Sequence, residues 1–266
     1  MVQKLPAGHF SVLSKNPTIL LLFLVLALIE FAALLVLFLA PSELFSSLFA
    51  PVIRRFWGEQ FLHYPENFVL LPKLFTHAHF VIVTFIGVVV SALVIKKVEG
   101  DVCGSESISI LAAAGFVLRK YFKLFIIWIA MYAVSRYAVT LVLLQETASI
   151  GYRFGMIYGV GILLHSFFAF LFPSVVLSEG KFLKSVWEGL FLSIKNFFCV
   201  LLVLAVPVAV LIGFSFIKSM TRFYIELFSP ESVLYVLMVG IIVSVMVDMF
   251  ITTATTILFL QVRKQS

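Results

Sequence analysis

The hydrophobic positions of this sequence gather into six long runs that few charged residues interrupt. The runs cover residues 17–40, 76–95, 121–144, 154–177, 197–216 and 232–260. As a helix rising about 1.5 Å per residue, each is long enough to cross a hydrocarbon core of about 30 Å. The pattern predicts an all-α, polytopic integral membrane protein, with six transmembrane helices bundled in one domain over 1–266.

Composition supports a membrane environment. Hydrophobic residues make up 62% of the chain and charged residues 12%, whereas soluble domains have about half and about a quarter. The first run, interrupted by Glu30, is too long for the apolar core of a signal peptide, and no Ala-x-Ala site follows it before Pro41. We therefore expect it to remain as an anchor.

The distribution of Lys and Arg predicts the orientation, because cytoplasmic loops carry an excess of both. With the N-terminus inside, twelve basic residues flank the inner ends of the spans and six flank the outer ends. The inner set is Lys4, Lys15, Lys96, Lys97, Arg119, Lys120, Lys123, Lys181, Lys184, Lys195, Arg263 and Lys264; the outer set is Arg54, Arg55, Lys73, Arg153, Lys218 and Arg222. Both termini are thus expected in the cytoplasm, and the protein in the inner membrane.

The net charge of +6 is spread over several cytoplasmic loops next to the bilayer. Anionic lipid headgroups are the nearest acidic partner for such loops, so no nucleic-acid binding is predicted. Cys103 and Cys199 both fall on the inner side in this topology, where ordinary thiols are expected.

The connection between the first two spans, "PSELFSSLFAPVIRRFWGEQFLHYPENFVLLPKLF", mixes aromatic and charged residues over three pieces that prolines separate. We expect three short interfacial helices with Phe56, Trp57 and Tyr64 at headgroup depth. The connection either follows the membrane surface, the reading that we favour, or forms a lid over an outward-facing cavity.

Two cytoplasmic connections share a design. "KKVEGDVCGSESISILAAAGFVLRKYFKLF" follows the second span and "SEGKFLKSVWEGLFLSIKNFF" follows the fourth. Each has Glu-Gly, then an amphipathic stretch with Gly115 or Gly189, then a basic and aromatic entry into the next span. The pattern is typical of an internal helix-pair repeat.

The segment "FPSVVLSEGKFLKSVWEGLFLSIKNFF", within residues 172–198, contains Pro173, Glu179, Gly189, Ser193 and Lys195. It resembles six-span prokaryotic membrane proteins related to the membrane domain of glycerophosphodiester phosphodiesterases. The resemblance implies a helical membrane module that often has an accessory role. No stretch of these 266 residues is expected to form a soluble phosphodiesterase domain, so the resemblance carries over no catalytic residue.

Polar residues lie on one face of the last span: Ser244, Asp248, Thr252, Thr255 and Thr256 occupy positions i, i+4, i+8, i+11 and i+12. An ionised group at the centre of a lipid-facing helix costs roughly 2.5–3.5 kcal/mol. This face is therefore expected to point into protein or water.

Four ionisable residues lie at similar depth, about 18–22 Å from the inner ends of their spans at 1.5 Å per residue. They are Glu30, Arg136, His165 and Asp248. Arg136 keeps its charge and needs an anion, either Asp248 or Glu30. The cluster is either an ion pair that orders the bundle or a proton- or ion-handling site, with His165 more often a core histidine hydrogen-bonded across helices.

Two other patterns concern histidines and glycines. His77 and His79 are about 200° apart around a helix and are not expected to share a metal ion. Gly151, Gly155 and Gly159 are spaced by four, the small-xxx-small pattern of closely packed helices.

The sequence shows no phosphate loop, dinucleotide fingerprint, zinc-protease motif or nucleophile elbow, so no catalytic, cofactor or metal residue is predicted. We expect a non-enzymatic transport or envelope accessory module that has a protein partner or self-associates. A small secondary transporter that uses the midplane charges is the alternative, and a lipid-modifying membrane enzyme is the third candidate.

Overall fold

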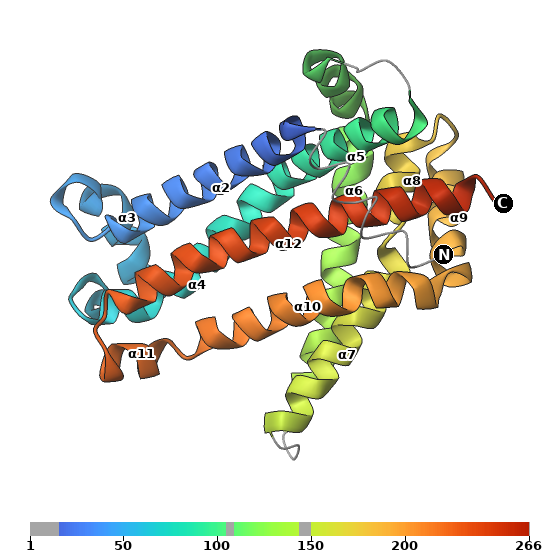
Figure 1. Cartoon of the computed structure of the whole chain (residues 1–266). Coiled ribbons are helices and arrows are strands. Elements are labelled where there is room, and N and C mark those ends of the chain that lie inside the picture. Colours follow the sequence, from blue (N-terminus) through green and yellow to red (C-terminus); the bar gives the residue numbers. More distant parts are fainter. Residues whose placement is uncertain (1–15, 105–108, 144–149, 266) are drawn as a thin grey trace. The chain divides into compact units, whose positions relative to one another are not determined.

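The computed structural model describes residues 16–104, 109–143 and 150–265 (Figure 1). These ranges are helical and contain no β-strand. The elements are α2 (Pro17–Phe38), α3 (Glu43–Phe56), η2 (Glu59–Leu62), α4 (Glu66–Ile82), η3 (Val83–Gly87), α5 (Val88–Cys103), α6 (Ile110–Leu143), α7 (Ile150–Phe168), α8 (Leu171–Leu177), α9 (Phe182–Lys195), α10 (Phe197–Ser219), α11 (Thr221–Leu227) and α12 (Ser232–Arg263).

Six helical segments in the described ranges are long and apolar enough to cross a membrane. They are Pro17–Phe38, Glu66–Cys103, Leu111–Val142, Gly155–Leu177, Phe197–Ser219 and Ser232–Arg263. The prediction of an all-α bundle with six spans is confirmed.

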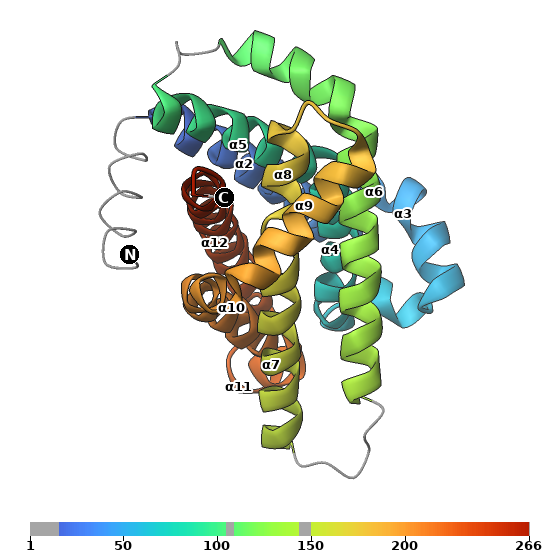
Figure 2. The same ribbon diagram turned by 90° about the vertical axis from the view of Figure 1, so that its right-hand side faces the viewer.

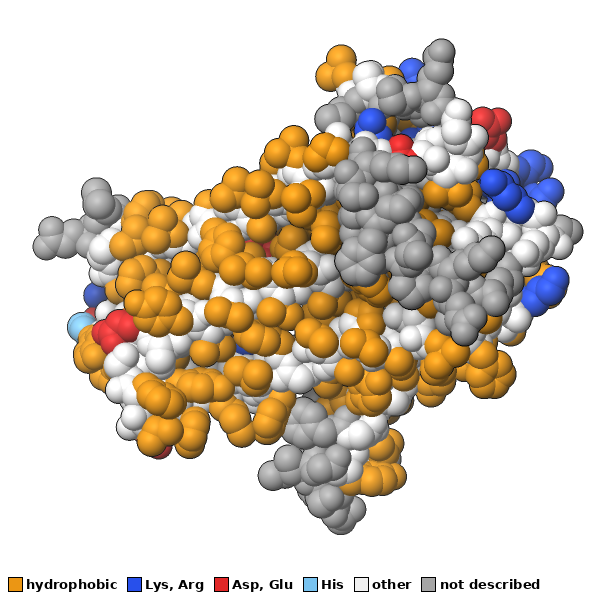
Figure 3. Space-filling model, viewed as in Figure 1, with side chains coloured by type: hydrophobic (Ala, Val, Ile, Leu, Met, Phe, Trp, Pro, Cys, Tyr) orange, Lys and Arg blue, Asp and Glu red, His pale blue; other side chains and the backbone are white. Residues whose placement is uncertain are grey.

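The spanning helices expose large apolar side chains. Leu20, Leu24 and Leu28 of α2 are each more than half exposed, and hydrophobic side chains cover much of the face shown in Figure 3. Such surface is costly in water and is stable in lipid. The described chain therefore has the surface of a multi-pass membrane protein.

The second span begins at Glu66, ten residues before its predicted start at Thr76. The connection between the first two spans is therefore shorter than predicted. Helix α3 and the short η2 form two separate pieces, but the expected third piece is part of α4, which continues through Pro72. The proline removes one backbone hydrogen bond, whereas ending the helix there would leave several backbone groups unpaired next to lipid.

The two connections that follow α5 and α8, which share a sequence design, differ in structure. After α5 ends at Gly104, in the left-handed conformation, the residues from Ile110 onward already belong to the long α6. After α8, by contrast, α9 is a separate helix between Lys181 and Asn196. The shared sequence design therefore gives a helix extension in one place and an independent helix in the other.

The chain divides into two compact units. The first contains Met1–Phe23, Thr84–Val210 and Val247–Ser266; the second contains Leu24–Val83 and Leu211–Met246. In the first unit α5 packs on α6 and α8, and α9 packs on α7 and α8 (Figure 2). In the second, η2 contacts α3 and α4, and α11 contacts α4. The predicted single domain stays a prediction.

Candidate functional site

A buried carboxylate lies in the second unit. Glu30 of α2 is only 1% exposed, and its Oε1 lies 3.1 Å from Nδ1 of His79 on α4. The approach is not aligned for a hydrogen bond, because Nδ1 has no hydrogen-bond partner among the described residues; the same holds for Oε2 of Glu30. Buried polar atoms are usually paired, so these two call for an explanation.

Local sequence determines the setting of this pair. Glu30 interrupts an otherwise apolar helix, so burial against α4 keeps its carboxylate away from lipid. Phe75, one turn before His79, is buried, and its ring centroid lies 6.1 Å from that of His79. Phe75 and His79 therefore lie on the same side of α4.

Lys218 of α10 provides a positive charge near this pair, because its ammonium interacts electrostatically with Glu30. On α12, Gly240 leaves room for the Lys218 stem: a Cβ added there would lie 3.7 Å from Lys218 Cδ and 2.9 Å from a ring carbon of Phe214. We call Glu30, His79 and Lys218 the Glu30 cluster. With neutral histidine its formal charge is zero.

The four residues predicted as a midplane cluster have different surroundings. Arg136 of α6 is exposed, and His165 of α7 is exposed with Nδ1 2.8 Å from the carbonyl oxygen of Gly161 in its own helix. Asp248 of α12 is half-buried and interacts with other residues. The pairing of Arg136 with Asp248 or Glu30 stays a prediction.

Sequence reasoning identified Glu30 but missed the two residues beside it. His79 was considered only as a metal ligand with His77, and Lys218 only as an outer-loop charge. The signal that could have found His79 is its place inside a predicted span, where a polar side chain calls for a partner. Lys218 gave no comparable signal, because it lies at a span end.

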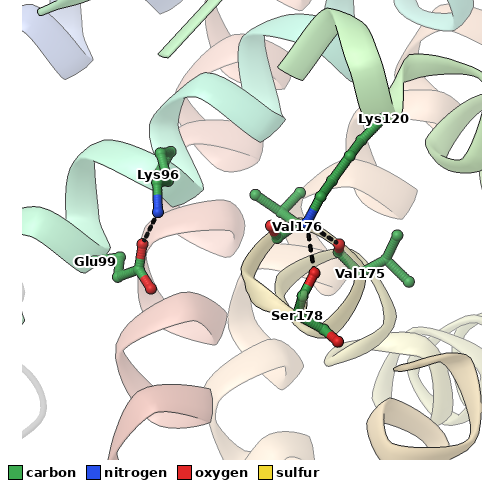
Figure 4. Close-up of polar contacts among 6 residues, drawn as sticks. All are labelled: Lys96, Glu99, Lys120, Val175, Val176 and Ser178. Atoms are coloured by element: carbon green, nitrogen blue, oxygen red, sulfur yellow. Dashed lines mark hydrogen bonds and ion pairs between the residues drawn. The ribbon is translucent and has the colours of Figure 1, made fainter. Parts of the chain in front are cut away.

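In the first unit, Lys120 of α6 closes the end of α8. Its Nζ donates to the carbonyl oxygens of Val175, Val176 and Ser178 at 3.3, 2.9 and 2.5 Å (Figure 4). These carbonyls lie at the helix C-terminus, which lacks intrahelical donors and carries partial negative charge. The ammonium also lies 4.4 Å from the ring centroid of Phe116. Lys120 thus ties α6 to α8.

Serine side chains join α8 to α9. Ser174 Oγ donates to the carbonyl oxygen of Ser185 at 2.7 Å, and Ser185 Oγ donates to Ser178 Oγ at 2.7 Å. Ser193 Oγ accepts from the backbone N–H of Phe170 at 3.2 Å. These buried hydroxyl groups satisfy one another and nearby backbone, so the contact is specific.

The structure describes a close approach of two helices at Gly189, and none at the predicted Gly155 and Gly159. A Cβ added at Gly189 of α9 would lie 2.9 Å from the carbonyl oxygen of Phe170, whereas at Gly155 or Gly159 it would meet no atom within 4 Å. The surroundings of Gly151 lie outside what the structure describes. Among the described residues, the small-xxx-small pattern in α7 therefore makes no tight contact.

The outward side of α9 is an apolar stripe. Its residues repeat every three or four positions, within an arc of about 80° at about 100° per residue. They are Leu183, Trp187, Phe191 and Ile194, and all four are more than half exposed. Lys181, Lys184 and Lys195 are exposed beside the stripe, while Glu188 is held 3.5 Å from Arg263.

Among the residues that the structure describes, no group of three or more His, Cys, Asp or Glu side chains could hold a metal ion. Comparison with protein-family models, curated proteins and solved structures finds no match to this chain.

Proposed function

We propose that this chain is a multi-pass inner-membrane protein, with both termini in the cytoplasm, that serves as a non-enzymatic accessory module of a transport or envelope system. The observation that carries the proposal is that Lys120 forms hydrogen bonds only with backbone carbonyl groups at the end of α8 among the contacts described. Its three carbonyl contacts employ the full donor capacity of an ammonium group. A polar group positioned in this way braces helices and is not presented to a substrate.

The proposed partner at the cytoplasmic surface is the anionic headgroup layer. The exposed apolar stripe of α9 would enter the acyl boundary, and Lys181, Lys184 and Lys195 would lie at headgroup depth. An accessory role also requires a protein partner or a second copy of the chain. The relation to the membrane domain of glycerophosphodiester phosphodiesterases remains part of the proposal, and it concerns the segment that contains α8 and α9.

A small secondary transporter is the second candidate, and the Glu30 cluster favours it. A buried carboxylate with an unpartnered oxygen, next to a histidine, is a typical feature of proton pathways in membrane proteins. In this function the cluster would couple a solute to an ion.

Reconstitution separates the two functions. Purified chain is placed in vesicles that enclose a pH-sensitive dye, and an inward proton gradient is applied with and without pools of small metabolites. The accessory function predicts that solutes do not change the rate of proton entry. Metabolite-dependent proton entry that Glu30→Gln abolishes would overturn it in favour of transport. His77 is an exposed histidine outside the cluster, so the same measurements on His77→Asn control for purification and reconstitution.

The accessory function has a positive test of its own. Membranes are extracted directly into polymer-bounded lipid discs, and the masses of the purified particles are measured. A constant stoichiometry of this chain with one other membrane protein, or with itself, is expected. Particles that contain a single copy of this chain alone would contradict the accessory role.

A further inference from the structure

We infer that Glu30 and His79 form a proton-binding site, in which one proton is shared between a buried carboxylate and a partly exposed imidazole. The inference deepens the second function proposed above and rests on it for its biological use. It assigns the ligand as a proton and His79 as the group through which that proton arrives.

The geometry between the two side chains calls for a proton. Glu30 Oε1 and His79 Nδ1 are 3.1 Å apart, yet neither Nδ1 nor Glu30 Oε2 has a hydrogen-bond partner among the described residues. If both atoms carried only lone pairs, they would repel each other at this distance. A proton on Nδ1 or on the carboxyl group lets one group donate to the other after a small rotation.

The two residues differ in how exposed their side chains are, which assigns them different roles in proton transfer. Glu30 is 1% exposed, whereas the side chain of His79 is 35% exposed. His79 is thus the more accessible member of the pair, and in the proposed site it takes a proton at one ring nitrogen and releases one from the other to the carboxylate. Histidine is suited to this step because its charge changes near neutral pH.

Lys218 compensates the ionised form. With Glu30 as carboxylate, His79 neutral and Lys218 as ammonium, the cluster has no net charge; proton uptake raises it to +1. Among the groups described around Glu30, His79 comes from α4 and Lys218 from α10, and α12 contributes the glycine backbone at Gly240 next to the Lys218 stem. The neighbour of the carboxylate is an imidazole nitrogen, which accepts a proton readily and is a poor ligand for a hard cation such as sodium, so a proton is the better occupant.

Infrared difference spectroscopy of the purified protein in lipid discs tests the inference directly. Between pH 4 and pH 9, acidification should produce the carbonyl stretching band of a protonated carboxyl group, with the usual downward shift in D₂O. Glu30→Gln should remove the band, and His79→Asn should shift its pH midpoint. The matched control His77→Asn removes an exposed histidine whose Nδ1 lies 2.7 Å from the carbonyl oxygen of Lys73, and should leave band and midpoint unchanged.

Three results would overturn the inference: no titrating carboxyl band in the wild type, a full band in Glu30→Gln, or an unchanged midpoint in His79→Asn. If Glu30→Gln does not fold, Glu30→Asp with isotopically labelled aspartate keeps the test decisive, because the label should move the band in that variant only. Sodium that suppresses the band at fixed pH would also contradict a proton-only site. The spectra require no transported solute, so this site and the transport function can fail separately.

Discussion

The ammonium nitrogen of Lys120 lies 2.9 Å from the carbonyl oxygen of Val176, so a side chain of α6 takes the place of the missing donors at the end of α8. Lys120→Met keeps the length of the stem and removes the charge. It leaves three carbonyl groups without this donor, and an unsatisfied buried polar group costs about 1–3 kcal/mol. We expect a lower melting temperature in detergent.

The control for this variant is Lys123→Met. Lys123 is exposed on the same helix, one turn further on, and its removal lowers the net charge by the same amount. Its melting temperature should stay close to that of the wild type. Equal losses in the two variants would show that the effect comes from charge and not from the contact with α8.

A second prediction concerns the backbone contact between α8 and α9. In Gly189→Ala the added methyl group would lie 2.9 Å from the carbonyl oxygen of Phe170 and 3.2 Å from Cα of Leu171, which cannot move as side chains do. Overpacking of this kind typically costs about 1–3 kcal/mol, and thermal unfolding should show the loss.

Gly155→Ala provides the comparison, because open space surrounds that position. Alanine is the better helix former by about 1 kcal/mol, so this variant should be as stable as the wild type or more stable. A loss of stability in Gly155→Ala would indicate a close helix contact at this position of α7, as the four-residue glycine spacing predicts.

The fold could be predicted from sequence to the extent that single helices determine it. Length and apolar composition identify each span, but they do not show where a helix continues past the hydrocarbon region. The prolines of the first connection predict separate short pieces, yet α4 passes through Pro72, since ending the helix would leave backbone groups unpaired.

The site was harder to predict because side-chain partners depend on how helices are rotated about their axes. The depths of Glu30 and Arg136 follow from counting residues, but the direction of each side chain does not. Glu30 proved to face His79, and Lys120 to face α8. The glycine pattern of α7 has the same limit: spacing identifies a smooth face without identifying what packs on it.

A third prediction tests the proposed orientation. Cys103 is exposed next to the left-handed Gly104 that ends α5. With Cys199→Ser, a membrane-impermeant maleimide should label Cys103 only after the membrane is opened. In a chain without native cysteines, Gln60→Cys, which is exposed in η2, should react in intact cells. The reverse labelling pattern would place the termini outside.

The last prediction concerns Trp187, which is 72% exposed in the apolar stripe of α9. With Trp57 and Trp128 replaced by phenylalanine, its emission should be blue-shifted in lipid discs and quenched by brominated acyl chains. Quenching should be stronger from brominated phosphatidylglycerol than from phosphatidylcholine, because each lysine near the surface attracts anionic lipid by about 1 kcal/mol. Lys184→Gln with Lys195→Gln leaves only Lys181 beside the stripe, so it should reduce that preference and keep the blue shift, since the apolar stripe is intact. Emission typical of water, with strong quenching by acrylamide, would show that α9 does not lie in the membrane interface.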